Sequence, residues 1–181
     1  TVYEEIYIFL KGHGDLLLVL NDEYIKNNVK EKFIQHIALA YIKDFETLDG
    51  DHSLIRLLLE RFEYEELSHL IWFIWTLRKE GDDKLTKKVY ELWPLLLRDL
   101  DFSRNEDRKL ASVLCHWAAF VDQVDDNSLK FLLTIAPYAD ESYNAYDLLK
   151  NLSRISEEQP FEANQIWQTM LQGSPSDYPE E

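Results

Sequence analysis

Residues 70–77 read LIWFIWTL, and residues 113–120 read VLCHWAAF, an apolar run that returns 43 positions after the first. Pro94 and Pro137 are separated by the same 43 positions. Around both runs, apolar side chains recur every three or four positions, which is typical of helices that bury one face. Two helices in a unit of about 40 residues are typical of stacked helical repeats. The sequence therefore predicts an all-α fold of stacked antiparallel helical hairpins.

Turn and cap residues divide the chain into predicted helices. Ser53 is expected to open one helix, Pro160 to occupy the first turn of another, and Gly173 to end it. Short joints between neighbouring helices make them antiparallel partners. The predicted helices cover residues 2–11, 16–20, 23–45 and 53–62, and then three pairs: 64–79 with 84–100, 106–124 with 128–138, and 142–156 with 161–171.

Three further local features are predicted in the repeat region. Ser103 and Glu106 have the spacing of a capping box. Asn127 or Ser128 is expected to cap the helix that follows them. Pro94 removes a backbone donor inside its helix and is expected to kink it.

The composition agrees with a folded, helical chain. Gly and Pro number only five each among 181 residues, too few for the many tight turns of a sandwich or barrel. Five Trp, ten Tyr and nine Phe supply a large apolar core. We expect a single all-α domain over residues 1–181, with a subdivision into 1–62 and 63–181. Helical patterns at both ends, with Pro179 at a first-turn position, predict a fragment of a longer chain.

The charge balance limits the kinds of partner. Lys and Arg number 19, Asp and Glu number 34, and the formal net charge is −15. Such a surface repels phosphate backbones and anionic lipids, so we expect neither nucleic acid nor membrane as partner. A positively charged protein partner, or plain solubility, is favoured instead.

The compartment is predicted from one cysteine and from the hydropathy pattern. Cys115 is the single cysteine, so no intrachain disulfide can form, as expected in a reducing environment. The longest mostly apolar stretch, residues 67–77, is about half the ~20 residues that a membrane span requires. We therefore predict a soluble, cytoplasmic protein.

Two residue groups have some features of catalytic or metal-binding sites. Glu66 and His69 share a helix face, but a di-iron site needs a second such pair and two more glutamates. Cys115 and His116 are adjacent, so on a helix they point about 100° apart and do not form a nucleophile–base pair. An ordinary structural role is favoured for each.

Two predicted loops carry residue types found in phosphate-binding and calcium-binding sites. Residues 12–15 read GHGD, which lacks the further glycines and the Lys of a phosphate-binding loop. Asp49, Asp51 and His52 lack the graded ligand set of a calcium loop. We predict no catalytic residue, no metal site and no cofactor.

The aromatic residues give the only binding candidates. Trp72, Phe73 and Trp75 occupy more than one face of the same predicted helix, so one of them is expected to be lightly covered. Exposed Trp side chains are favoured anchors in protein interfaces. Trp72 and Trp75 are therefore the predicted partner-binding residues.

The last part of the chain carries a family resemblance. Residues 148–156, LLKNLSRIS, and residues 160–167, PFEANQIW, resemble HEAT-like helical repeats of large bacterial multidomain proteins. In such proteins a nucleotide-binding signalling or defence module often precedes a helical-repeat tail. The resemblance implies an α-solenoid architecture and no chemistry, since this chain carries no nucleotide-binding motif. An irregular helical bundle is the structural alternative.

These observations favour a non-catalytic protein-interaction or scaffolding module that binds another protein or another domain of its own chain. The first alternative is a regulatory or sensor helical domain of a nucleotide-dependent signalling or defence protein. A stand-alone enzyme and an acidic nucleic-acid mimic are the remaining alternatives.

Overall fold

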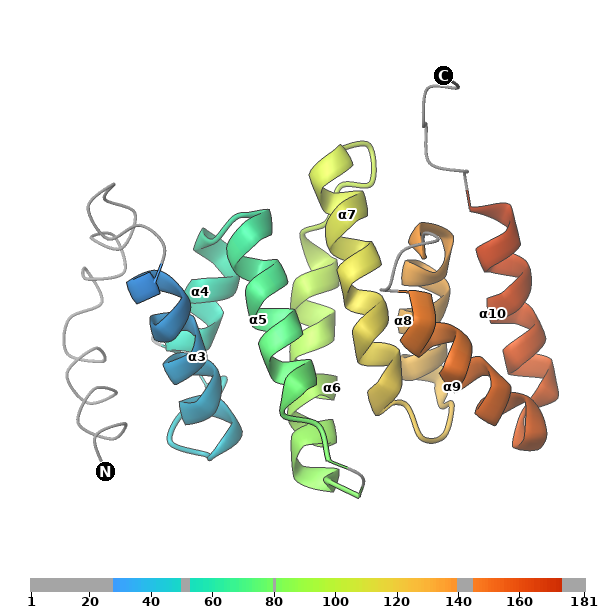
Figure 1. The fold of residues 1–181 in the computed structure, drawn as a ribbon, viewed down its shortest axis with the longest axis horizontal. Coiled ribbons are helices and arrows are strands. Elements are labelled where there is room, and N and C mark those ends of the chain that lie inside the picture. The colour runs from blue at the N-terminus through green and yellow to red at the C-terminus, as the bar shows by residue number, and fades with distance from the viewer. Residues whose placement is uncertain (1–27, 50–52, 80, 140–144, 174–181) are drawn as a thin grey trace. The chain divides into compact units, whose positions relative to one another are not determined.

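The computed structural model describes residues 28–49, 53–79, 81–139 and 145–173. Within these ranges the chain forms eight α-helices and two 3-10 helices and no strand, which confirms the all-α prediction (Figure 1). The elements are α3 (Asn28–Ile42), α4 (Leu54–Arg61), α5 (Tyr64–Thr76), α6 (Asp83–Arg98), α7 (Asn105–Leu114), η2 (Cys115–Phe120), α8 (Asp126–Ile135), η3 (Ala136–Tyr138), α9 (Ala145–Glu158) and α10 (Pro160–Gln172).

Some predictions concern residues that the structure does not describe. The helices expected at 2–11 and 16–20, the GHGD loop at 12–15 and the helix start around Pro179 lie outside the described residues. Among the described helices, none has the length and apolar character needed to cross a membrane.

The chain forms two compact units, residues 1–77 and residues 78–181. The helices α3, α4 and α5 belong to unit one, and the helices from α6 onward belong to unit two. The two helices of the first predicted pair, α5 and α6, therefore belong to different units. The sequence-based subdivision at residue 62 and the 43-residue repeat stay predictions.

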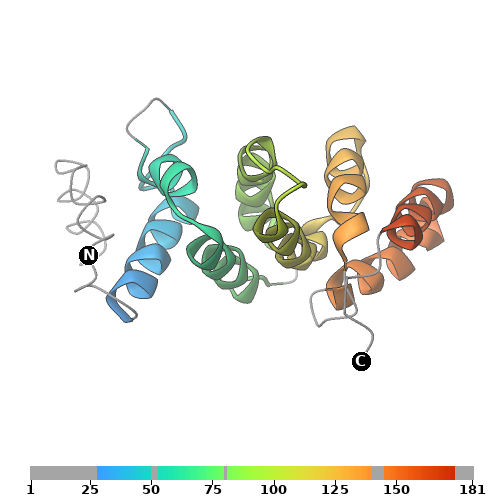
Figure 2. The ribbon, with the colours of Figure 1, turned by 90° about the horizontal axis from the view of Figure 1, so that it is seen from above.

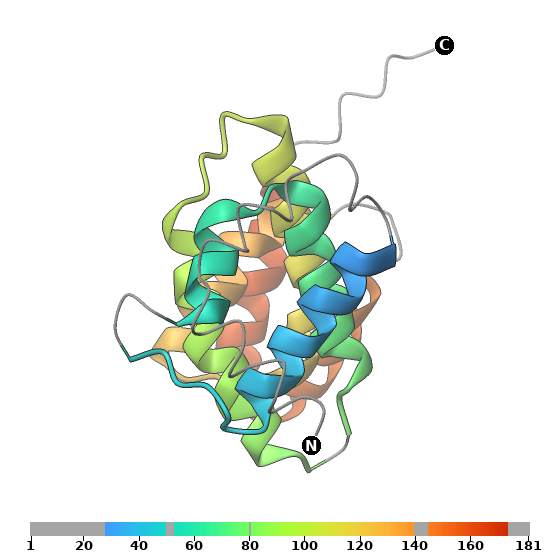
Figure 3. The ribbon, with the colours of Figure 1, turned by 90° about the vertical axis from the view of Figure 1, so that its left-hand side faces the viewer.

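In unit one, α3 packs against both α4 and α5 (Figure 3). Its buried face carries Ile34, Ile37 and Tyr41. The predicted helix over 23–45 ends earlier than expected, at Ile42, because Asp44 adopts a positive φ of 61°. Short polar residues tolerate this left-handed conformation, which closes helices at their C-terminal ends.

The first turn of α4 is stabilised by Ser53 and by Glu46, which lies in the loop after α3. Ser53 accepts a hydrogen bond from the Arg56 amide, as predicted for a cap. The buried carboxylate of Glu46 accepts a hydrogen bond from the Ser53 hydroxyl at 3.0 Å and one from the Ile55 amide at 2.8 Å. Amides at a helix start have no partner inside the helix, so this carboxylate joins the loop after α3 to α4.

Unit two departs from the predicted helix over 106–124. The α-helix α7 stops at Leu114, and residues Cys115–Phe120 tighten into the 3-10 helix η2. In η2 and the residue after it, Trp117, Ala118 and Val121 are fully buried. A 3-10 helix has three residues per turn, so it turns different side chains inward than a continued α-helix would.

The predicted capping box at Ser103 and Glu106 is wrong. Arg104 is the cap residue of α7, and its side chain makes no capping hydrogen bond. The hydroxyl of Ser103 instead donates to Asp101 at 2.7 Å, while Asp107 accepts the Asp101 amide. Ser103 therefore stabilises the turn before α7, since short polar side chains readily bond their own local backbone and neighbours.

The cap of α8 lies earlier than predicted. Neither Asn127 nor Ser128 is the cap; Asp125 is, and its carboxylate accepts the Ser128 amide at 2.7 Å. The Ser128 hydroxyl in turn accepts the Asp125 amide, which completes a capping box. These hydrogen bonds hold the pKa of the Asp125 carboxyl below its usual value, with the Ser128 amide as the largest cause.

The third predicted pair is confirmed as α9 and α10. Pro160 occupies the first position of α10 and Gly173 follows its last residue, both as predicted. The helix α9 packs on η2, and α10 packs on α9, α8 and η3 (Figure 2). Gly173 passes so close to the Pro137 carbonyl that a side chain there would clash with this backbone oxygen. This close approach explains why a glycine ends α10.

Replacement of the α8 cap is expected to destabilise unit two. Asp125→Ala should lower the free energy of unfolding by about 1 kcal/mol at neutral pH, because the Ser128 amide loses its partner. The folded-state pKa is lowered, so the contribution of the charged carboxylate is present above the unfolded-state pKa. It is lost as the pH falls through the folded-state pKa.

Urea unfolding at neutral and acidic pH measures both effects. The difference between the wild-type protein and Asp125→Ala should shrink at acidic pH, and exposed Asn127→Ala should change stability little. An equal loss in both variants would contradict the assignment of the cap.

Candidate functional site

Polar side chains of α9 hold the irregular segment around η2. The Asn151 side-chain amide donates to the Ala118 carbonyl at 2.6 Å, and both groups are buried. Asp147 lies 2.8 Å from Nδ1 of His116, which is also buried. The Ala118 carbonyl also accepts the Val121 amide at 3.0 Å, so the Asn151 amide is its second partner. Both contacts of α9 join this helix to buried groups of η2.

Gln159, between α9 and α10, makes a second connection of this kind. Its side-chain oxygen accepts the Val124 amide at 2.7 Å, and its side-chain nitrogen donates to the Val124 carbonyl at 2.8 Å. One side chain thereby satisfies both backbone groups of a residue in the turn before α8. The turn is fixed against the far end of α9 as a result.

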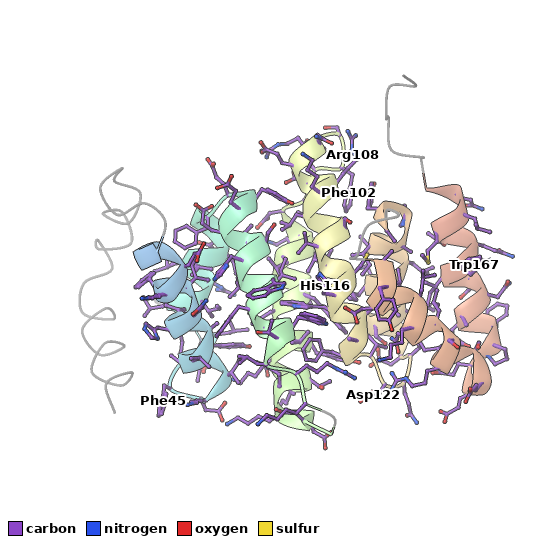
Figure 4. The ribbon with its side chains drawn as sticks, viewed as in Figure 1. Phe45, Phe102, Arg108, His116, Asp122 and Trp167 are labelled. Atoms are coloured by element: carbon purple, nitrogen blue, oxygen red, sulfur yellow. The ribbon has the colours of Figure 1, made fainter. Side chains whose placement is uncertain are left out.

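Arg154, also on α9, makes a third set of contacts with this segment. Its guanidinium donates to the Val121 carbonyl, to the Asn151 side-chain oxygen at 2.7 Å and to Asp122 at 2.5 Å. A guanidinium is planar and carries five N–H groups, so three partners restrict its orientation. The group is fixed where the segment after η2 turns towards α8. Figure 4 shows His116 among the helices and Asp122 at the far end of the segment.

A cleft of about 400 Å³ opens beside these contacts, within unit two. We call it the basic cleft, because four basic side chains line it together with three aspartates, smaller neighbours and polar groups. The basic side chains are Arg78, Lys79, Lys150 and Arg154. The aspartates are Asp82, Asp122 and Asp147.

A second hollow lies on the outer face of α9 and α10. We call it the α9–α10 groove; its volume is about 390 Å³, and the described residues that line it include no charged side chain. They are Leu149, Leu152, Ser153, Ser156, Pro160, Ala163, Asn164 and Trp167. Trp167, on α10 in Figure 4, is 45% exposed. Tyr146 on α9 and Leu171 on α10 are exposed as well.

The predicted anchors Trp72 and Trp75 lie on α5 in unit one. Trp72 is 47% exposed, and its ring centroid lies 6.0 Å from that of His69. Trp75 is partly buried. Their role as partner-binding residues stays a prediction.

The candidate metal and catalytic residues have structural partners. Glu66 accepts the Glu63 amide at the start of α5, and His69 lies 3.1 Å from the Gln35 side chain. Cys115 is buried with its thiol towards the Ala111 carbonyl. Asp51 and His52 lie outside the described residues. Within the described ranges, no three His, Cys, Asp or Glu side chains lie together as a metal site requires.

Among the described residues, Tyr90 has the largest pKa shift. Burial raises the pKa of its phenol to about 12, and the nearby Asp125 and Asp122 charges add to the effect. Its ring lies 4.0 Å from Trp93, which stacks on Phe131 at 4.3 Å. A phenol is already neutral at physiological pH, and the raised pKa makes loss of the Tyr90 proton still less favourable, which suits a packing role better than proton transfer.

Comparison with family models, with curated proteins and with solved structures finds no match to this chain. The two hollows are thus defined by the geometry alone. Neither was predicted from the sequence, although the apolar residues of the α9–α10 groove alternate with polar ones at helical spacing.

Loss of the Asn151 contact is expected to destabilise the η2 segment. Asn151→Ala removes one of the two donors to the buried Ala118 carbonyl, which keeps the Val121 amide, and should lower the free energy of unfolding by about 1 kcal/mol. Exposed Asn164→Ala on α10 removes the same side chain and should cost much less. Amide hydrogen exchange over residues 118–124 should accelerate in Asn151→Ala alone. Similar exchange in the two variants would show that α9 does not hold this segment.

Proposed function

We propose that this protein is a protein-interaction module that holds an amphipathic helix of a partner protein in the α9–α10 groove. The observation that carries the proposal is an uncharged groove with a half-exposed Trp167 beside it. Apolar grooves between helices are a recurrent way of binding amphipathic helices. Contiguous apolar surface on a soluble domain commonly marks an interaction site.

The energetic contribution is expected to concentrate on the tryptophan. Trp side chains bury a large area and dominate many interfaces, with losses of 2 kcal/mol or more on truncation. Leu149 and Pro160 flank the groove and would exclude water around the ring. Groove-lining Ser153, Ser156 and Asn164 would orient the bound helix through polar contacts.

The net charge of the chain favours a positively charged partner. With a net charge of −15, a second copy of this chain is repelled, whereas a basic partner is attracted. The proposed ligand is therefore an amphipathic helix with Lys or Arg residues flanking its apolar face. The module itself needs no catalytic residue or cofactor for this role.

Another domain of the same chain is the alternative occupant, as in a regulatory helical domain of a nucleotide-dependent signalling or defence protein. This reading is favoured by one observation, that the residues carrying the family resemblance are those of α9 and α10. A cytoplasmic location is proposed in either case, because the lone Cys115 is buried as a thiol.

The groove can be tested with peptides selected from a displayed random library on the wild-type protein. Selected peptides should carry apolar residues at three- and four-residue spacing and flanking basic residues. Trp167→Ala should weaken their binding by about 30-fold, the size expected for loss of a 2 kcal/mol anchor. Exposed Gln168→Ala, next to the groove but not lining it, should leave affinity within about twofold.

Fluorescence anisotropy with labelled peptides measures these affinities. Peptides that bind Trp167→Ala as tightly as the wild-type protein, or a selection dominated by acidic peptides, would contradict the proposal. Circular dichroism of each variant separates lost binding from lost folding.

The predicted anchors on α5 are tested by a second selection, performed on the Trp167→Ala protein. If Trp72 and Trp75 form a binding surface, these peptides should bind about tenfold more weakly to Trp72→Ala, because an exposed ring has been removed. Trp75→Ala should act in the same direction, with its thermal stability measured in parallel because Trp75 is partly buried. Undiminished binding in both variants would exclude these residues as anchors.

A further inference from the structure

The basic cleft collects positive charge in a chain that is strongly acidic. Arg78 and Lys79 precede α6, whereas Lys150 and Arg154 lie one turn apart on α9. Four of the 19 basic side chains of the chain therefore meet around one cleft, against 34 acidic side chains overall. The lining also contains three aspartates, so its basic side chains exceed its acidic ones by one, in a chain whose net charge is −15. Basic side chains gathered in a cleft attract negative charge.

The three aspartates of the cleft are engaged with other groups. Asp147 pairs with His116, and Asp122 pairs with Arg154. Asp82 caps α6 by accepting the Leu85 amide at 3.0 Å. By contrast, none of the ion pairs among the described residues involves Arg78, Lys79 or Lys150. Three cations are thus available to a ligand, while the nearby carboxylates already have partners.

The position of Arg154 in the cleft also favours the binding of an anion. Arg154 is held in place by Val121 and Asn151, so it would not have to be ordered on binding. Gly81 and Thr86 of the lining lie at the start of the 16-residue helix α6, which the Asp82 carboxylate already caps, so the basic side chains and not this helix start would hold an anion. Guanidinium and ammonium groups bind phosphate oxygens through short, charge-assisted hydrogen bonds.

We propose that the basic cleft binds a small molecule that carries a phosphate group on an uncharged body. The volume of about 400 Å³ falls in the range of small-molecule pockets and exceeds the needs of a bare ion. A nucleic-acid strand does not fit this description, because its further phosphates would meet the acidic surface outside the cleft.

Isothermal titration calorimetry at low, constant ionic strength tests the proposal, with glucose 6-phosphate, glucose and inorganic phosphate as probes. Glucose 6-phosphate should bind more tightly than inorganic phosphate, and glucose should not bind. The double variant Lys79→Gln/Lys150→Gln should weaken glucose 6-phosphate binding by about tenfold or more, since it removes two charged contacts. Added salt should weaken binding to the wild-type protein.

The control variant Lys109→Gln/Lys130→Gln removes the same charge from exposed positions of unit two that do not line the cleft. It should change the affinity less than about twofold. Equal losses in the two double variants would show a general charge effect and overturn the site. Absence of binding to the wild-type protein would do the same, and equal affinity for inorganic phosphate would overturn the small-molecule part of the proposal.

Discussion

The structure of unit two depends on how the chain satisfies its backbone where α7 gives way to η2. Trp117, Ala118 and Val121 are fully buried there, so the polar backbone of the same segment is withdrawn from water. Side chains of Arg154 and Gln159 take the place of water at the backbone groups of Val121 and Val124. Asn151 adds a second hydrogen bond to the Ala118 carbonyl, which also accepts the Val121 amide. An irregular segment can lie in a packed interior only under this condition, because each unpaired group would cost about 1–3 kcal/mol.

The helix α9 serves the fold and both hollows with different faces. Asn151 and Arg154 hold η2 and the residue after it, and they line the basic cleft together with Lys150. Leu149 lines the α9–α10 groove instead. Residues three or four apart share a face of a helix, whereas neighbours in sequence do not. The same 14-residue helix therefore supports the fold and both hollows. A substitution on α9 has to be assigned to one face before its effect on binding can be interpreted.

The positions of the helices could be predicted because each buries one apolar face, and this spacing is visible in the sequence. The ends were harder to predict, since they depend on which of several polar residues takes the cap. The stretch Asp125–Ser128 offers four acceptable caps, and the Ser128 amide and hydroxyl together select Asp125. The change at Cys115 has no local signal, because residues 115–120 contain neither Gly nor Pro. Burial of Trp117 and Val121 from several sides decides it, and that is a tertiary effect.

The candidate site was less predictable for the same reason. Trp117 and Trp167 both stand in helical patterns, yet Trp117 is fully buried and Trp167 is 45% exposed. Only the packing of other helices separates them. Net charge is a similarly poor guide to a local site. The value of −15 for the whole chain argues against phosphate ligands in general. In physiological salt, however, exposed charges beyond about 8 Å are largely screened. A small ligand inside the basic cleft would therefore respond to Arg78, Lys79 and Lys150 more than to the net charge of the chain, whereas a long polyanion would also meet the acidic surface.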